Sequence, residues 1–172
     1  GEKQTAAESR VSLAKLAIEE GHDSDAEAST RSSKAEFHEE QQADDELNAS
    51  IVLIDALLAQ GKQAEAQKEM EAIQQLGQGS QNGFLRLQFE LASCRVLMKS
   101  AHPEAAGPLL TGLNRDAQRY GFADLEFESK LALAELAKKT NRRGQAQIEL
   151  HALQKSASSK GFGLIARKAL QE

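Results

Sequence analysis

Apolar residues recur along this chain in a pattern of about 40 residues that occurs four times. In the second copy, an apolar helix face is followed by a glycine and then by an alanine: Leu53, Ile54, Leu57, Leu58, Gly61 and Ala66. The corresponding alanines of the four copies lie 40, 39 and 41 residues apart, at Ala26, Ala66, Ala105 and Ala146. A fixed spacing in this range indicates stacked pairs of helices, because one pair alone cannot bury its apolar face.

The apolar spacing and the residues between apolar segments predict where the helical pairs lie. We expect pairs at about residues 5–42, 43–79, 81–120 and 122–160, followed by a further helix at 162–171. Gly21 and Gly61 mark the end of the first helix in a pair, because glycine tolerates the positive φ found there. Asn141 takes this place in the fourth copy and Ser100 in the third.

Polar residues after the turns predict how the helices begin. Asp23, Ser24 and Asp25 are candidate N-caps for the second helix, and Asp44 or Asp45 for the third. Pro103 fits the first turn of a helix, where its missing N–H is not needed. Residues 29–33 make the second helix polar, so we expect it to be the weakest packing element. The glycine-rich segment 77–83 predicts a flexible linker.

The composition indicates an all-α protein. Aromatic residues make up only 4% of the chain and Trp is absent, whereas Ala, Leu, Glu, Gln and Lys are abundant. These residues lose little side-chain freedom in a helix, and the β-branched residues that favour sheets are sparse. A helical bundle without repeats is the alternative fold.

Charge and hydropathy narrow the class of partner. The net charge is −5, and residues 1–50 hold five Lys or Arg against 13 Asp or Glu. This balance lacks the basic footprint of a nucleic-acid binder, so we expect no nucleic acid. No apolar run approaches the roughly 20 residues that span a bilayer, and no signal peptide is evident, so we expect a cytoplasmic protein without a membrane partner. The single Cys94 fits a reducing compartment.

The order of leucine-rich helix, turn residue and early alanine resembles the tetratricopeptide repeat. The positions that match are Leu13-Ala14, Gly21 and Ala26, then Leu53, Gly61 and Ala66, then Leu133-Ala134, Asn141 and Ala146. The period near 40 exceeds the usual 34 residues, and the proline that usually closes the second helix is missing. The chain is therefore similar to the longer-helix variant of bacterial signalling proteins and transcription activators. This resemblance implies one domain, 1–172, forming a right-handed superhelix of about four antiparallel hairpins plus a C-terminal helix.

The resemblance also implies a binding surface on the concave side, formed by the first helices of the pairs. The positions that it places there are Glu8, Ser12, Lys15, Glu19, Asn48, Asp55, Ala59, Glu90, Cys94, Met98, Glu128, Glu135 and Lys139. Their mixed charge suits a polar peptide, although an ordinary solvated surface is the alternative. Relatives that bind chaperones hold a C-terminal carboxylate with a cluster of Lys, Arg and Asn, which we do not find here.

Motifs for catalysis or metal binding are not found in the sequence. Cys94 is better interpreted as a buried apolar residue than as a reactive thiol. The four histidines lack the spacing of a metal site, and segment 77–83 lacks the Lys-Ser/Thr of a phosphate loop. The alternating acids from Asp23 to Glu27 lack the glycine and closing glutamate of a calcium loop. Phosphorylation within residues 29–33 stays open. We expect no cofactor, no metal and no enzymatic activity.

The function expected from these observations is a non-catalytic scaffold or adaptor module within a larger bacterial signalling or regulatory protein. Its partner would be a protein, a peptide or another domain of the same parent chain. One alternative is a small-molecule sensor, in which Asn48, Asp55, Glu90 and Glu128 would converge on a ligand. Another is self-association, in which the apolar helix 162–170 packs on the first repeat of a second copy.

Overall fold

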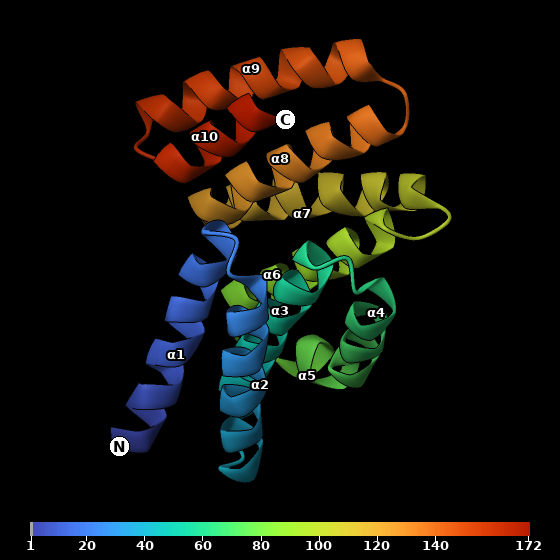
Figure 1. Cartoon of the computed structure of the whole chain (residues 1–172). Coiled ribbons are helices and arrows are strands. Elements are labelled where there is room, and N and C mark those ends of the chain that lie inside the picture. Colours follow the sequence, from blue (N-terminus) through green and yellow to red (C-terminus); the bar gives the residue numbers. More distant parts are fainter. Residues whose placement is uncertain (1) are drawn as a thin grey trace. The chain divides into compact units, whose positions relative to one another are not determined.

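A computed structural model describes residues 2–172, with side chains from residue 5 onward, and every regular element in that range is helical (Figure 1). The all-α prediction is confirmed. The elements are α1 (Glu2–Glu19), α2 (Asp23–Glu39), α3 (Ala43–Ala59), α4 (Gln63–Ala72), α5 (Gln74–Gly79), α6 (Gly83–Met98), the 3₁₀ helix η1 (Pro103–Ala105), α7 (Ala106–Tyr120), α8 (Ala123–Lys139), α9 (Arg143–Ser159) and α10 (Gly163–Gln171).

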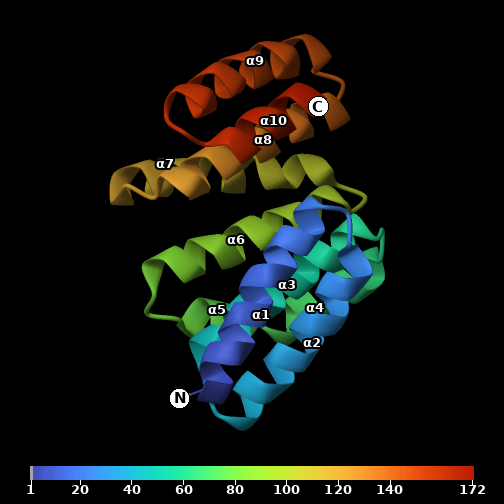
Figure 2. The same cartoon turned by 60° about the vertical axis from the view of Figure 1, so that its left-hand side comes forward.

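The chain divides into two compact units, one ending at Val96 and one formed by Leu97–Glu172. In the first unit, α2 packs against α1 and α3, and α4 packs against α3. In the second unit, α8 packs against α7 and α9, and α10 packs against α9. Figure 2 shows these neighbouring helices within each unit from a second direction. The third expected pair, 81–120, spans the boundary, so its two helices belong to different units.

Turns of one kind connect most of the helices and recur at multiples of 20 residues. Six turns of the described chain carry a residue with positive φ just past a helix end: Gly21, Gln41, Gly61, Gly121, Asn141 and Gly161. The next N–H then donates to the carbonyl five residues back, as from Lys62 to Leu57 at 2.8 Å. This is the Schellman arrangement, which satisfies carbonyls at a helix end. The prediction for Asn141 is confirmed, whereas Ser100 does not have a positive φ.

The predicted N-caps are wrong, although the acidic residues still lie at helix starts. The N-cap positions of α2 and α3 are His22 and Gln42, and neither side chain makes a capping hydrogen bond. Asp23 and Asp25 lie within the first turn of α2, where a negative charge interacts favourably with the helix dipole. Pro103 occupies the first position of η1, as predicted.

The repeat alanines permit close helix packing, and the structure corrects one of them. Ala26, Ala66 and Ala146 are fully buried. In the third copy the buried residue is Ala106, whereas the expected Ala105 is exposed. The spacing of the buried alanines is therefore 40 residues throughout.

The glycine-rich linker predicted at 77–83 is also wrong in its first part. Residues 74–79 form α5, which follows a break of the preceding helix at Ile73. Gly77 is buried, and a Cβ built there would lie 2.5 Å from the ring of Phe89 on α6. The glycine therefore permits close packing of α5 against α6 rather than chain flexibility.

Each unit has its own apolar core. In the first, Leu47, Ile54 and Leu57 of α3 pack with residues of α4 and α6. In the second, the rings of Phe127 and Phe162 lie 4.8 Å apart between centroids. The polar helix α2 is better packed than its sequence predicts: its fully buried Thr30 donates to the Ala26 carbonyl at 2.7 Å, and its fully buried Ser33 to the Ala7 carbonyl at 3.3 Å.

Candidate binding groove

Several residues expected on the concave face lie next to one another in the first unit. Lys15 of α1 donates to the side chain of Asn48 on α3, with 3.3 Å between Nζ and Oδ1. Asp55 of α3 accepts two hydrogen bonds of 3.1 Å from one guanidinium nitrogen of Arg95 on α6. The structure thus brings the first helices α1, α3 and α6 together, with their polar groups engaged by one another.

Cys94 has no accessible thiol to offer a ligand. Its side chain is buried, with 2% of its surface exposed, which agrees with the apolar interpretation and removes it from the predicted binding face. Burial, helped by the negative charge of Glu90, raises the pKa of the thiol to about 11. Cys94 is therefore protonated at neutral pH and is a poor nucleophile.

The remaining predicted positions lie on the expected helices but do not line a described cavity. Ser12 is exposed and donates to the Glu8 carbonyl of its own helix at 3.1 Å. Glu90 is exposed, whereas Glu19, Glu128 and Glu135 are partly exposed. Lys139 of α8 donates from Nζ to the carbonyl of Met98.

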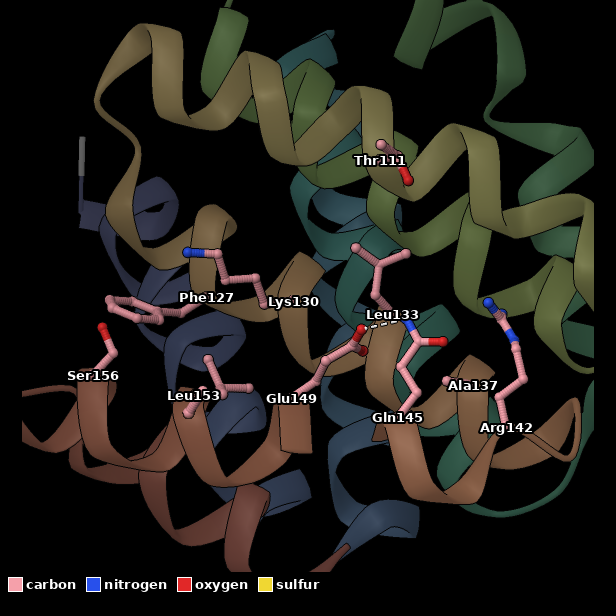
Figure 3. Close-up of a pocket in the computed structure, with 11 residues that line it drawn as sticks. Thr111, Phe127, Lys130, Leu133, Ala137, Arg142, Gln145, Glu149, Leu153 and Ser156 are labelled. Atoms are coloured by element: carbon pink, nitrogen blue, oxygen red, sulfur yellow. Dashed lines mark hydrogen bonds between the residues drawn. The ribbon is translucent and has the colours of Figure 1, made fainter. Parts of the chain in front are cut away.

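Two cavities lie instead along the second helices of the pairs, one in each unit. The first unit has a shallow cavity of about 410 Å³ between α2 and α4, with Leu53 of α3 among its lining residues. The second unit has a cavity of about 560 Å³ between α7 and α9, over α8, which we call the α7–α9 groove (Figure 3). Its lining residues are Thr111, Phe127, Lys130, Leu133, Ala137, Arg142, Gln145, Glu149, Ala152, Leu153 and Ser156.

The two cavities occupy corresponding places in the chain. A shift of 80 residues superimposes the bounds of α3, Ala43–Ala59, on those of α8, Ala123–Lys139. The same shift converts Leu53 to Leu133, and Glu69 on α4 to Glu149 on α9. Both cavities therefore have a leucine of the middle helix at their base and a glutamate of the last helix at their edge.

In the first unit, three ion pairs join α2 to the segment of α4 at or beside this cavity; we call these pairs the salt-bridge ladder. They are Glu27 to Lys62 at 2.7 Å, Arg31 to Glu65 at 3.0 Å and Lys34 to Glu69 at 2.5 Å. Hydrogen bonds from Lys62 and Gln60 hold the pKa of Glu27 at about 2. The base of this cavity is covered, since Leu53 exposes 1% of its surface.

In the second unit, the charged residues that α2 contributes to the salt-bridge ladder have no charged equivalents on α7. Gly107, Thr111 and Asn114 stand where the shift of 80 residues places Glu27, Arg31 and Lys34. Asn114 is committed locally, because its amide donates to the Glu126 carbonyl at 3.0 Å and to the Ser129 hydroxyl at 2.8 Å. Thr111 is the α7 residue that lines the α7–α9 groove, and Leu133 is partly exposed at its base.

The α9 side of the groove keeps two of the charges that the first unit carries along α4, as Arg142 in place of Lys62 and Glu149 in place of Glu69. Arg142 lies at one end and Phe127 with Lys130 at the other, while Leu133, Gln145 and Glu149 lie between them (Figure 3). Gln145 donates to a carboxylate oxygen of Glu149 at 2.8 Å, and the Arg142 Nε donates to the Thr140 hydroxyl at 3.2 Å.

Lys130 is already paired within α8. Its ammonium lies 2.5 Å from the carboxylate of Glu126, and this contact lowers the pKa of Glu126. The ammonium also lies 5.6 Å from the centroid of the Phe127 ring, within the range of a cation–π contact. Lys130 therefore forms a wall of the groove rather than an unpaired charge.

The arrangement suits binding: an apolar base of Leu133, Leu153 and Phe127 is edged by a few polar groups. Within the described part of the chain, no three His, Cys, Asp or Glu side chains gather as a metal site would require. No described helix is both long and apolar enough to cross a membrane. Comparisons with protein-family models, curated proteins and solved structures found no match for this chain.

Sequence reasoning from the resemblance missed this groove. It directed attention to the first helices, whereas the groove lies along the second helices α7 and α9. A signal was nevertheless present, since comparison of residues 80 positions apart shows charged residues replaced at 107, 111 and 114 but retained at 142 and 149.

Proposed function

We propose that the chain is a non-catalytic protein- or peptide-binding module, part of a larger bacterial signalling or regulatory protein. We further propose a tetratricopeptide-like right-handed superhelix of four hairpins and a C-terminal helix as its architecture. The turns at multiples of 20 residues and the buried alanines every 40 residues support this architecture. The cytoplasm is the proposed compartment.

The α7–α9 groove is the observation that carries this proposal. It combines an apolar base, in which Leu133 is partly exposed, with polar groups at defined places, which are the features of a recognition site. Its lining includes neither histidine nor cysteine, so a nucleophile paired with an imidazole base cannot be assembled from it. Of the residues expected on the concave face, Lys15 and Asn48 bond to each other and Asp55 is paired with Arg95, which makes the groove the stronger candidate for a partner.

Selection of peptides against the immobilised chain tests this function. Leu133→Arg places a charged side chain at the base of the groove and should abolish retention of selected peptides. Leu13→Arg is the matched control, because Leu13 precedes Leu133 by three periods of 40 residues and is 63% exposed on α1. Circular dichroism and thermal melting establish that both variants fold. Equal retention of peptides by the two variants would refute binding in the groove.

A small-molecule sensor is a second candidate, which the size of the groove favours. Its volume of about 560 Å³ lies within the range of about 300–1,000 Å³ typical of small-molecule sites. A metabolite collection that raises the melting temperature of the native chain, but not of the Leu133→Arg variant, would support this function. If no metabolite raises the melting temperature and peptides are still retained, the sensor function is ruled out and the peptide-binding function stands.

Self-association is a third candidate, favoured by apolar residues at the two ends of the chain. Leu13 and Leu16 on α1 and Leu170 on α10 each expose more than half of their surface. Contact between such unlike surfaces of two copies would produce chains or rings. Sedimentation over a wide concentration range tests this, and a constant monomer mass would rule it out.

A further inference from the structure

We propose that the α7–α9 groove binds a helical segment of a partner protein that carries a carboxylate facing Arg142 and, seven residues later, a cationic side chain facing Glu149. This inference rests on the proposed peptide-binding function and specifies its ligand. The partner segment would supply the half of the salt-bridge ladder that the second unit lacks.

The first unit shows which charges belong together in such a groove. Three side chains of α2 each pair with a side chain of opposite charge across the groove: Glu27 with Lys62, Arg31 with Glu65, and Lys34 with Glu69. The charges along α2 are therefore negative, positive and positive, and those facing them are positive, negative and negative. Partner numbers rise together along both segments, so the two run in parallel. Complementary charges therefore appear in a defined order along the groove.

The second unit retains the receiving side of this order. Arg142 corresponds to Lys62, Gln145 to Glu65 and Glu149 to Glu69, so both terminal charges are kept and only the central one is neutral. On the opposite side, Gly107, Thr111 and Asn114 replace the three charged residues of α2, and none of them is charged. A cationic end and an anionic end thus line the same groove without charged counterparts across it.

The surroundings of Arg142 and Glu149 do not provide those counterparts. Among the described residues, Arg142 makes its side-chain hydrogen bond to the hydroxyl of Thr140, and Glu149 accepts from the neutral amide of Gln145. Neither takes part in an ion pair with a described residue, whereas Lys62 and Glu69 in the first unit both do. An incoming segment of opposite charge order would complete both contacts.

The spacing of the two charges fits a helix. Arg142 and Glu149 are seven residues apart along α9 and its N-terminus, which corresponds to roughly 10 Å, or about two helical turns. A bound helix presents residues i and i+7 on one face at the same separation, and the residues between them at i+3 and i+4 reach the apolar base. The N-terminus of α9 also favours a carboxylate beside Arg142. These features together define a parallel helix with its acid first.

The experiment is a selection with a phage-displayed library of random 15-residue helical peptides against the full chain. We expect the retained peptides to carry Asp or Glu followed seven residues later by Lys or Arg, with apolar residues between. Affinities of fluorescein-labelled selected peptides are then measured by fluorescence anisotropy. The charge-exchanged variant Arg142→Glu/Glu149→Lys should bind them at least tenfold more weakly. It should also bind peptides with the reversed charge order at least tenfold better than the native chain does.

A second variant keeps the test independent of charge exchange. In this double variant, Gly107→Glu restores the first pair of the ladder, opposite Arg142, and Thr111→Arg adds a long side chain from α7 beside the neutral Gln145. A Cβ at Gly107 would meet only the Leu136 side chain, at an ordinary 3.5 Å. We expect this variant to be more stable and to bind the selected peptides at least tenfold more weakly. Leu13→Arg should bind them as the native chain does.

The possible outcomes separate this inference from the function on which it rests. If selected peptides require Leu133 but lack the acid–base pair, or bind the charge-exchanged variant equally well, the proposed ligand is wrong and peptide binding stands. If no selected peptide depends on Leu133, the proposed function and this inference both fail.

Discussion

Removal of the charge of Glu27 should destabilise the first unit in a strongly pH-dependent way. The substitution Glu27→Gln keeps the size and hydrogen-bonding oxygen of the side chain but removes its charge. Glu27 receives hydrogen bonds from Lys62 at 2.7 Å and from Gln60 at 2.8 Å, and pairs with Arg31 at 2.9 Å. No other carboxylate in the described salt-bridge ladder has so many donors, so the effect should be largest here.

The magnitude follows from the pKa of Glu27. A fall from the ordinary value of 4.5 to about 2 corresponds to at most roughly 3 kcal/mol of folding free energy at pH 7. Lys62 and Arg31 are 39% and 48% exposed, so solvent screening reduces the expected loss to about 1–2 kcal/mol. Because the pKa is lowered in the folded state, this stabilisation is complete above pH 4.5 and disappears as the pH falls toward 2.

Urea unfolding monitored by circular dichroism at pH 7 and pH 3 measures the effect. We expect the loss of stability in Glu27→Gln at pH 3 to be less than half of its value at pH 7. Tyr120 is the only tyrosine and Trp is absent, so tyrosine fluorescence reports on the second unit as an internal control. Equal losses at both pH values, or no loss at pH 7, would refute the electrostatic role of Glu27.

Three further substitutions and one chemical treatment test the packing and the turns. Gly77→Ala should cost about 1–3 kcal/mol, measured by urea unfolding, because its Cβ would overlap the ring of Phe89. Gln41→Gly should raise the free energy of unfolding by about 1 kcal/mol, because Gln41 has a φ of 56°, whereas Gly61→Ala should lower it similarly. Cys94 should resist iodoacetamide at pH 8 in the folded protein and react once urea unfolds it; rapid labelling of the folded protein would contradict its burial.

The sequence predicts the helices well because local signals decide them. Glycine and asparagine after an apolar helix adopt the left-handed conformation at Gly21, Gly61 and Asn141, as expected from backbone sterics alone. Gln41 escapes this prediction, because glutamine has no intrinsic preference for positive φ and adopts it where the packing of α2 against α3 determines the turn.

Features that depend on neighbours from elsewhere in the chain were mispredicted. Gly77 resembles a linker residue locally, yet the ring of Phe89 makes it a packing residue. Likewise, Leu13 and Leu53 occupy the same place in the 40-residue pattern, but Leu13 is exposed and Leu53 is buried beneath α2 and α4. An apolar pattern identifies the face of a helix and does not reveal whether another helix covers it.

The same reasoning explains why the α7–α9 groove could not be found from the apolar pattern. Leu53 and Leu133 both fit the apolar pattern. Whether the cavity above each leucine is covered or open depends on polar residues, which the apolar pattern does not include. Gly107 instead of Glu27 removes a salt bridge, while Arg142 in place of Lys62 retains the cation. Each change taken alone is unremarkable on a helix surface. Only their positions on opposite sides of one groove connect them, and an unpaired half of a ladder then indicates which charges a partner must bring.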